Sequence, residues 1–256
     1  MRNPKVIVIT GASSGLGAAL AFEYARPGVT LCLTGRNSER LAEVAAKCKD
    51  LGAVVITTIL DVRDENELAA WLLDIDKKTP VDLVIANAGV SYGTLGGEDI
   101  KQVKDLFATN VDGAINTIHP LIDNMVARKN GQIAIVSSMA SFIALPSSPT
   151  YSASKAAVRY YGLALRGLLH KYKVNVSVII PGYIATNMTA VNKFPMPFLM
   201  KAEKAAKIIR KELEKNKALI VFPKTMYFFI RLVNLLPLKF LIPLLASLPG
   251  KPNMKS

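Results

Sequence analysis

Short apolar runs alternate with longer segments of helical periodicity along most of the chain. Each run has the length and composition of a strand that is buried on both faces of a parallel sheet. The predicted strands are 6–9, 30–34, 54–60, 82–86, 132–136, 175–180 and 218–222. Apolar side chains at three- and four-residue spacing predict helices over 18–26, 38–51, 65–78, 100–128, 150–170 and 201–216.

The regular order of strand, helix and strand predicts an α/β fold. We expect a doubly wound parallel sheet of about seven strands with helices on both faces. No linker-like stretch interrupts residues 1–222, so this part is expected to form a single domain. Residues 223–256 differ in being both apolar and basic, and they are expected to form a C-terminal extension.

Composition narrows the class of protein further. About half of the 256 residues are hydrophobic, which is ample for a core and argues against disorder. The spacing of Cys32 and Cys48 fits neither a metal site nor a disulfide framework, so we expect a reducing compartment and no bound metal. The first strand begins too early for a secretory signal to precede it, which favours a cytoplasmic location.

The net charge of +13 is unevenly distributed. Residues 193–256 contain 13 Lys or Arg against three Glu, a net +10, whereas 19 bases and 16 acids give only +3 before them. A basic segment can bind nucleic acid, but no helix-turn-helix, zinc finger or aromatic stacking motif accompanies this one. We therefore expect no nucleic-acid partner.

A glycine-rich turn, Thr10–Gly17 (TGASSGLG), joins the first strand to the first helix. Glycines in such a turn permit a tight bend and a close approach of backbone to a pyrophosphate, which the helix N-terminus attracts. A purely structural turn is the alternative, but the position between an N-terminal strand and a helix favours a dinucleotide site. The predicted contacts are Gly11, Ser13, Ser14, Gly15, Leu16 and Gly17.

Cofactor choice is expected to depend on the end of the second strand. An NAD site usually has an acidic residue there for the ribose 2′-hydroxyl, whereas this chain has Arg36. A guanidinium suits a 2′-phosphate, so we predict NADP(H) over NAD(H), although Arg36 could be only a solvated loop charge. Asp61, after the third strand, could accept from the adenine amino group or cap the next turn.

A tyrosine, a lysine and a serine are the candidate catalytic groups. Tyr151 and Lys155 are four residues apart on a predicted helix and therefore share one face. A positive neighbour favours the phenolate and would lower the tyrosine pKa toward the range useful for acid–base chemistry. Ser138 ends the fifth strand, where its hydroxyl could hold a substrate oxygen. By itself, however, the spacing Tyr-x-x-x-Lys also occurs commonly by chance.

Several of these motifs together resemble the short-chain dehydrogenase/reductase family, which has a Rossmann-type fold. The match covers roughly residues 5–222. The residues that carry it, in family order and spacing, are Thr10-Gly-x-x-x-Gly15-x-Gly17, Asn87-Ala-Gly89, Asn110, Ser138, Tyr151-x-x-x-Lys155 and Pro181-Gly182. Ala86 departs from the pattern, since the family often has a second asparagine there.

The resemblance implies a role for each matched residue. Tyr151 would be the general acid in reduction, Lys155 would bind the nicotinamide ribose, and Ser138 would polarise the substrate carbonyl. Asn110 would hold a water that links Lys155 to solvent; from the residue alone, its amide could equally point to solvent or join a polar chain behind Lys155. The remaining expected cofactor-binding residues are Asp61, Val62, Asn87, Ala88, Gly89, Pro181, Gly182, Ile184 and Thr186. A homodimer or homotetramer, built on the helices that contain Asn110 and Tyr151, is also implied.

Two apolar segments lie outside the catalytic motifs. Residues 187–200 are apolar and rich in proline, which suits a substrate lid. Residues 223–249 are long enough to span a membrane, but Arg231, Lys239 and two prolines disfavour a simple span. An amphipathic stretch in the interface of a membrane, at its cytoplasmic face, is one interpretation. A flap over the substrate pocket or a subunit contact is the other.

The leading hypothesis is an NADP(H)-dependent oxidoreductase that interconverts a carbonyl and a secondary alcohol on an apolar or lipid-like small molecule. The alternative is a non-catalytic dinucleotide sensor or membrane-associated scaffold with the same fold. The intact Tyr151, Lys155 and Ser138 weigh against the alternative, because a sensor does not need all three.

Overall fold

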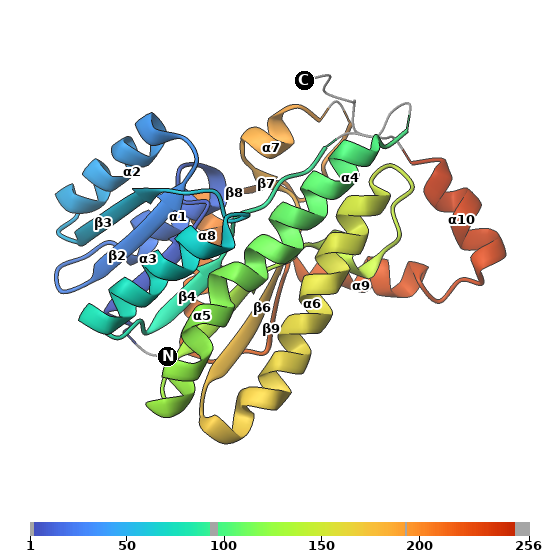
Figure 1. Cartoon of the computed structure of the whole chain (residues 1–256). Coiled ribbons are helices and arrows are strands. Elements are labelled where there is room, and N and C mark those ends of the chain that lie inside the picture. Colours follow the sequence, from blue (N-terminus) through green and yellow to red (C-terminus); the bar gives the residue numbers. More distant parts are fainter. Residues whose placement is uncertain (1–2, 93–96, 193, 249–256) are drawn as a thin grey trace.

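The computed structural model describes residues 3–92, 97–192 and 194–248. Its centre is a seven-stranded parallel sheet in the order β3-β2-β1-β4-β5-β6-β9 (Figure 1). The strands are β1 Val6–Thr10, β2 Thr30–Gly35, β3 Val54–Ile59, β4 Leu83–Ala86, β5 Gln132–Val136, β6 Asn175–Pro181 and β9 Leu219–Phe222. The predicted sheet is therefore confirmed, and each strand ends within one residue of its expected position.

Helices cover both faces of the sheet, as the alternating pattern predicts. Residues of α1 Gly15–Tyr24, α2 Ser38–Asp50 and α8 Ala202–Glu214 form one hydrophobic core with the strands. Residues of α3 Glu65–Lys78, α5 Gly113–Ala127 and α6 Pro149–Leu169 form the core on the opposite face. The strands β1, β2, β4, β5 and β6 are buried on both faces, which explains why they are continuous apolar runs, whereas the edge strand β3 is largely exposed.

The strand order reverses at β1, which lies between β2 and β4. After β3 the chain crosses back over β2 and β1 to add β4, and the later strands extend the sheet in the opposite direction. In sheets of this kind the loops on the two sides of the reversal separate, and a crevice opens at the carboxyl ends of the strands. The glycine turn follows β1, and Asn87 follows β4, so both border this crevice.

The predicted single helix over 100–128 consists of three parts. α4 Ile100–Phe107 and α5 are joined by a π-helical turn, Ala108–Asp112. Asn110 lies in that turn and is buried. A single π-helical turn is rare and occurs frequently at functional sites. Because the wider turn changes the direction of its side chains, 3.6-residue periodicity could not predict where the Asn110 amide points.

The segment after β6 combines short elements with loop. It contains β7 Ile184–Ala185, α7 Asn187–Ala190 and β8 Met200–Lys201, and the two strands pair in parallel. Two short 3-10 helices, Met139–Phe142 and His170–Tyr172, flank the ends of α6. The predicted lid, 187–200, thus begins with a helical turn and ends at β8; residue 193 lies outside the described residues.

The C-terminal extension forms two helices, α9 Lys224–Val233 and α10 Leu238–Ala246. Pro237 is the N-cap of α10, so the helical wheel of a single amphipathic helix does not apply across it. Residues 249–256 of the predicted extension lie outside the described residues. Among the residues that the structure describes, every helix is too short or too polar to cross a membrane.

Two glycines within α6 have different surroundings. A Cβ at Gly162 would lie 2.6 Å from Val178 Cγ2 and 3.1 Å from Ile135 Cδ1, so this glycine lets α6 pack closely on β5 and β6. A Cβ at Gly167 would meet no atom within 4 Å. Close packing therefore explains the glycine at position 162. At position 167, no packing contact offsets the low helix propensity of glycine.

We predict opposite effects of alanine at these two positions. Gly167→Ala should raise the free energy of unfolding by about 0.5–1 kcal/mol, because alanine is the better helix former and meets open space. Gly162→Ala should lower it by about 1–3 kcal/mol, because the added methyl group overpacks the interface with the sheet. Urea denaturation of both variants measures the two changes. Equal effects would contradict the assignment of Gly162 to close packing.

Candidate active site

A cavity of about 780 Å³ lies at the carboxyl ends of the strands. Loops that follow β1, β2, β3, β4, β5 and β6 all contribute to its lining. The expected site residues that line it are Gly11, Ser13, Ser14, Gly15, Leu16, Arg36, Asp61, Val62, Asn87, Ala88, Gly89, Ser138, Tyr151, Lys155, Pro181, Gly182, Ile184 and Thr186. Gly17 and Asn110 are outside the lining.

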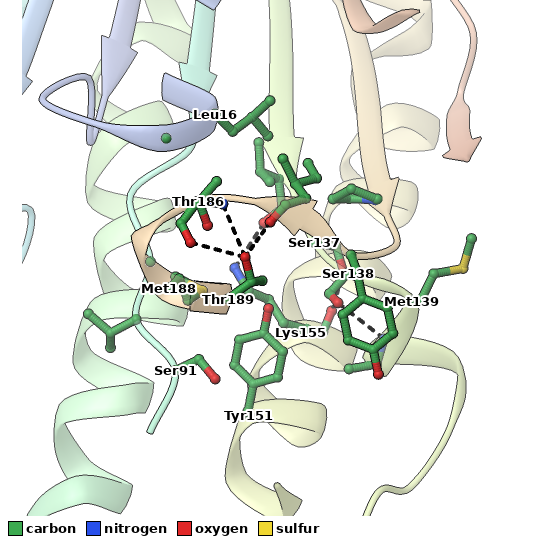
Figure 2. A pocket seen from close by; sticks show the side chains of 18 of the residues that line it. Leu16, Ser91, Ser137, Ser138, Met139, Tyr151, Lys155, Thr186, Met188 and Thr189 are labelled. Carbon is green, nitrogen blue, oxygen red and sulfur yellow. Dashed lines mark hydrogen bonds between the residues drawn. The ribbon is translucent and has the colours of Figure 1, made fainter. Parts of the chain in front are cut away.

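Tyr151, Lys155 and Ser138 meet on one wall of this cavity, with Leu16 across from them (Figure 2). The Lys155 Nζ lies 5.9 Å from the centre of the Tyr151 ring, as their four-residue spacing on α6 predicts. Ser138 is the N-cap of the short helix after β5, and its hydroxyl accepts from the Ala140 N–H at 3.2 Å. This cap fixes the serine side chain beside the tyrosine.

The strand β5 also holds the lysine in place. Lys155 Nζ donates to the Val136 carbonyl oxygen at 3.1 Å, and the Ser137 hydroxyl donates to the Lys155 carbonyl oxygen at 2.7 Å. Lys155 is almost fully buried. These two hydrogen bonds therefore attach α6 to the end of β5, close to Ser138 and Tyr151.

Burial dominates the pKa values of the two titratable groups. It raises the pKa of Tyr151 above its ordinary value, while hydrogen bonding with Ser138 acts in the opposite direction. Burial also lowers the pKa of Lys155 from 10.5 to about 8. The sequence predicts that Lys155 lowers the pKa of Tyr151. In the cofactor-free chain this pKa is raised instead, because desolvation of the phenol outweighs the other effects.

Asn110 acts on the cavity from behind its wall. Its Nδ2 donates to the Val90 carbonyl oxygen at 3.0 Å and to Ser154 Oγ at 3.1 Å, and its Oδ1 accepts from the Val90 N–H at 2.8 Å. The amide thus fixes the loop after β4 against α6, and it does not point to solvent. A Cβ at Gly89 would lie 3.1 Å from Asn110 Oδ1 and 3.2 Å from Lys155 Nζ, so a larger residue there would crowd both groups.

The glycine turn packs directly on the loop after β4. Gly11 has a φ of +66°, and a Cβ there would lie 2.8 Å from Ala88 Cα. A Cβ at Gly17 would lie 2.2 Å from the Gly11 carbonyl oxygen, so Gly17 serves packing of the turn and does not line the cavity. Asn87 Nδ2 donates to the Thr10 carbonyl oxygen at 3.0 Å and closes the contact.

The N-terminus of α1 faces this cavity, and its free backbone N–H groups have few acceptors or negative charges nearby in the chain. Ser14, its N-cap, makes no side-chain capping hydrogen bond, and the first turn carries no acidic residue. By contrast, Asn37 and Asp64 cap α2 and α3 with their side chains. A phosphate would supply both the missing acceptors and the negative charge that a helix N-terminus attracts. The turn therefore fits a dinucleotide.

Three charged side chains lie where the adenosine end of such a dinucleotide would bind. Arg36 Nη1 lies 3.7 Å from Asp61 Oδ2, and Arg63 Nη2 lies 2.7 Å from the same oxygen. Burial tends to raise the pKa of Asp61, but the hydrogen bonds from Arg63 and the charge of Arg36 hold it below its ordinary value. Arg40, in the first turn of α2, was indicated by no motif and also lines the cavity.

The opposite end of the cavity is apolar, and most of its residues were not predicted individually. Tyr183 follows the expected Pro181-Gly182 pair, and its ring lies 6.2 Å from that of Phe194, centre to centre. Met226, Phe229 and Ile230 of α9 complete this end. Tyr183 adjoins a motif, and Phe194 lies in the predicted lid, 187–200. The α9 residues belong to 223–249, so their place in the lining agrees with the interpretation of that segment as a flap over the pocket.

The candidate catalytic groups therefore lie between two compartments. A polar compartment with a helix N-terminus and two arginines fits a dinucleotide, and an apolar compartment begins at Tyr151. Among the residues that the structure describes, no group of three His, Cys, Asp or Glu side chains could hold a metal ion.

Comparisons with known proteins agree with this geometry. The short chain dehydrogenase family model matches residues 5–194. An uncharacterised oxidoreductase of Myxococcus xanthus is 35% identical over 236 residues, which are 91% of this chain and 93% of that protein.

Solved structures show the same fold. A short-chain dehydrogenase from Sphingobium yanoikuyae in complex with NADPH has a TM-score of 0.80 at 21% identity. A short chain dehydrogenase/reductase from Burkholderia phymatum in complex with NAD has a TM-score of 0.83 at 23% identity. In both comparisons the match covers 98% of each chain.

No comparison supports the alternative of a non-catalytic scaffold, and structures of this fold with either NADPH or NAD are similar to the chain. The family model covers well over half of the chain, and the similarity to the bacterial oxidoreductase extends over nearly all of it. The chain therefore belongs to the short-chain dehydrogenase/reductase family and is an NAD(P)-dependent oxidoreductase.

Proposed function

We propose that this protein is an NADP(H)-dependent oxidoreductase that interconverts a carbonyl and a secondary alcohol on an apolar small molecule. The observation that carries the proposal is the position of Tyr151, Lys155 and Ser138 at the boundary between the polar and apolar compartments of one cavity. A nicotinamide cofactor, when bound, supplies the hydride. Every other requirement is met by side chains of this chain.

Ser138 and Tyr151 bind and protonate the substrate oxygen. The Ser138 hydroxyl donates to that oxygen, and its cap hydrogen bond from Ala140 keeps it oriented. Tyr151 donates the proton in reduction and accepts it in oxidation. A positioned acid–base group of this kind contributes about 10²–10⁴ in rate.

Lys155 supplies a positive charge beneath the tyrosine. With a pKa of about 8 its ammonium form predominates at neutral pH, although burial disfavours it. A positive charge 5.9 Å from the ring centre favours the phenolate that remains after proton transfer. Asn110 is a positioning residue in this scheme, because it holds Val90 and Ser154 and leaves the proton transfer to Tyr151.

Arg36 and Arg40 are assigned to the 2′-phosphate of NADP(H). Both line the polar compartment, and Arg36 remains 58% exposed, so its guanidinium can reach a ligand. Asp61 contacts the adenine and is held in place by Arg63. Charge-assisted hydrogen bonds from a guanidinium to phosphate are among the stronger polar interactions in proteins.

The substrate class follows from the apolar compartment. Phe194, Met226, Phe229 and Ile230 offer large hydrophobic surfaces, whereas Tyr183 adds a phenol near the reacting groups. Such a site favours a ketone or alcohol with an extended hydrocarbon part. We also assign a homodimer or homotetramer to α5 and α6, because Tyr160 and Leu168 of α6 are exposed.

Replacement of the tyrosine tests the acid–base assignment. Tyr151→Phe should lower kcat by about 10²–10⁴ while NADPH binding is retained, because only the proton donor is removed. Tyr160→Phe is the matched control, since it changes an exposed tyrosine on the same helix. Turnover by NADPH absorbance and cofactor binding by fluorescence are the measurements. Normal turnover of Tyr151→Phe would refute the mechanism.

Replacement of Arg36 tests the cofactor assignment. Arg36→Ala should weaken NADPH binding by roughly 10–100-fold, as expected for loss of a hydrogen bond between charged groups, and should leave NADH binding nearly unchanged. Arg63→Ala is the control, because Arg63 also contacts Asp61 but does not line the cavity. The Kd of each cofactor is measured by titration. If Arg63→Ala has the same selective effect, Arg36 acts only through Asp61.

The burial of Lys155 predicts a specific pH dependence of stability. Its folded pKa of about 8 lies below the unfolded value of 10.5, so the unfolded chain binds more protons within that window. Stability from this group is therefore lowest below pH 8 and rises toward pH 10.5. Relative to Lys155→Met, the cofactor-free protein should gain on the order of 3 kcal/mol across the window.

Urea denaturation at several pH values measures this difference. Lys207→Met is the matched control, because it removes a lysine that is exposed on α8. A constant difference between the Lys155→Met variant and the unchanged protein would show that the lysine is not desolvated.

A further inference from the structure

A continuous stretch of exposed apolar side chains covers α9, α10 and the turn after them. Leu235, between the two helices, is 78% exposed. We call this stretch the tail surface; its members are Phe228, Phe229, Leu232, Leu235, Leu236, Leu238, Phe240, Ile242, Leu244 and Leu248. Soluble monomers rarely expose contiguous apolar patches of this kind unless they bind another molecule or a membrane.

The tail surface is held by the domain. Ile230 of α9 is buried in a small core with Met139, Val178 and Ile180. The Tyr227 ring packs edge-on against Phe142 at 5.1 Å between centres.

The turn between α9 and α10 is also hydrogen-bonded to the domain. Asn234 Nδ2 donates to the Phe142 carbonyl oxygen. α10 buries only Leu241 and Leu245, and in Figure 1 it lies at the end of the molecule away from β3. The exposed side chains of the two helices are therefore presented in a defined arrangement and not by a loose terminus.

The dimensions of these helices favour a position in a membrane interface over one across it. α9 has 10 residues and α10 has 9, so each is about 15 Å long at 1.5 Å per residue. The hydrocarbon core of a bilayer is about 30 Å thick. Helices of this length can bury an apolar face among headgroups and upper acyl chains while they lie parallel to the membrane plane.

The charged side chains that α9 and α10 carry have one sign. Lys224, Arg231 and Lys239 are exposed on the same two helices. Residues 215–256 contain seven Lys or Arg and no Asp or Glu. This charge is complementary to anionic lipid headgroups. It disfavours a symmetric contact with a second copy through these helices, because such a contact would bring the same bases together without an acidic complement.

The tail surface also borders the cavity. Phe229 is 67% exposed and Leu248 is 45% exposed, yet both line the cavity. From the segment 187–200, Met188 and Phe198 likewise combine exposure with a place in the lining. The apolar compartment therefore reaches the outside of the molecule through side chains that belong to, or lie beside, the tail surface.

We propose that the tail surface docks on an anionic lipid bilayer and that the cavity opens at this contact, so that apolar substrate enters directly from the lipid. The docking stands on the exposed side chains and charges alone. The entry route rests in addition on the proposed function, because it needs the apolar compartment to be the substrate site.

Flotation with vesicles tests the docking. Full-length protein should float with vesicles that contain phosphatidylcholine and phosphatidylserine, and it should float much less with phosphatidylcholine alone. The double variant Leu235→Asp/Leu238→Asp should lose vesicle affinity by at least about tenfold, because two apolar side chains no longer enter the interface. The triple variant Lys224→Gln/Arg231→Gln/Lys239→Gln should bind the anionic vesicles roughly 100-fold more weakly.

The matched control is Leu51→Asp/Leu73→Asp, which changes two exposed leucines at α2 and α3 and should float as the unchanged protein does. Circular dichroism and NADPH binding show whether each variant is folded. Equal flotation of all variants would overturn the docking. Loss of self-association in the leucine variant, with vesicle binding unchanged, would assign the tail surface to a second copy.

Turnover separates the entry route from the proposed function. With anionic vesicles present, the leucine variant should lose kcat/KM for a long-chain ketone dissolved in the lipid and keep it for a short water-soluble ketone. Equal loss for both ketones would overturn the entry route. If neither ketone is reduced by the unchanged protein although it floats, the proposed function fails and the entry route with it, while the docking stands.

Discussion

The buried ammonium of Lys155 is the interaction on which the site depends. It lies at the point where α6, the end of β5 and the loop after β4 meet, and it has the Val136 carbonyl as its hydrogen-bond partner. A Cβ at Gly89 would lie 3.2 Å from its Nζ, so a side chain at this position in the loop after β4 would crowd the ammonium. A desolvated charge is costly, and the fold accepts this cost at the position where charge is useful to a neighbouring phenol.

Close backbone contacts elsewhere in the fold also position the segments that surround the cavity. Gly11 and Gly17 bring the turn after β1 onto Ala88 and Asn87, and Gly162 brings α6 onto β5 and β6. These positions share one physical property, a space too small for a methyl group. Together they keep the two halves of the cavity at a fixed separation, so that the boundary between polar and apolar compartments coincides with Tyr151.

The sheet and the polar, cofactor-facing part of the cavity lining could be predicted from the sequence, because both depend on local signals. Continuous apolar runs indicate strands buried on both faces, and the motifs follow those strands at their carboxyl ends. Asn110 shows where local reasoning fails. Its direction is set by a π-helical turn and by Val90, twenty residues away in sequence, and neither leaves a pattern in the chain.

The sequence predicts an apolar lid over 187–200 and offers a flap over the pocket from 223–249, and residues of both segments line the cavity. The individual residues of the apolar compartment and the direction of the tyrosine pKa shift could not be predicted, for a similar reason. Met226 and Phe229 belong to a segment without motifs, and only tertiary packing brings α9 to the cavity. The four-residue spacing correctly placed Lys155 beside Tyr151. It could not reveal that burial of the phenol outweighs the effect of a charged neighbour, because desolvation depends on every residue around it.

The hydrogen bond from Asn234 to the Phe142 carbonyl has a practical consequence. Phe142 ends the short helix that Ser138 caps, so the turn between α9 and α10 braces the segment that carries the Ser138 hydroxyl. Deleting everything after β9 would remove that brace together with the hydrophobic exterior. A shortened protein would then confound two effects, and single substitutions on the outer faces of α9 and α10 are the cleaner way to separate them.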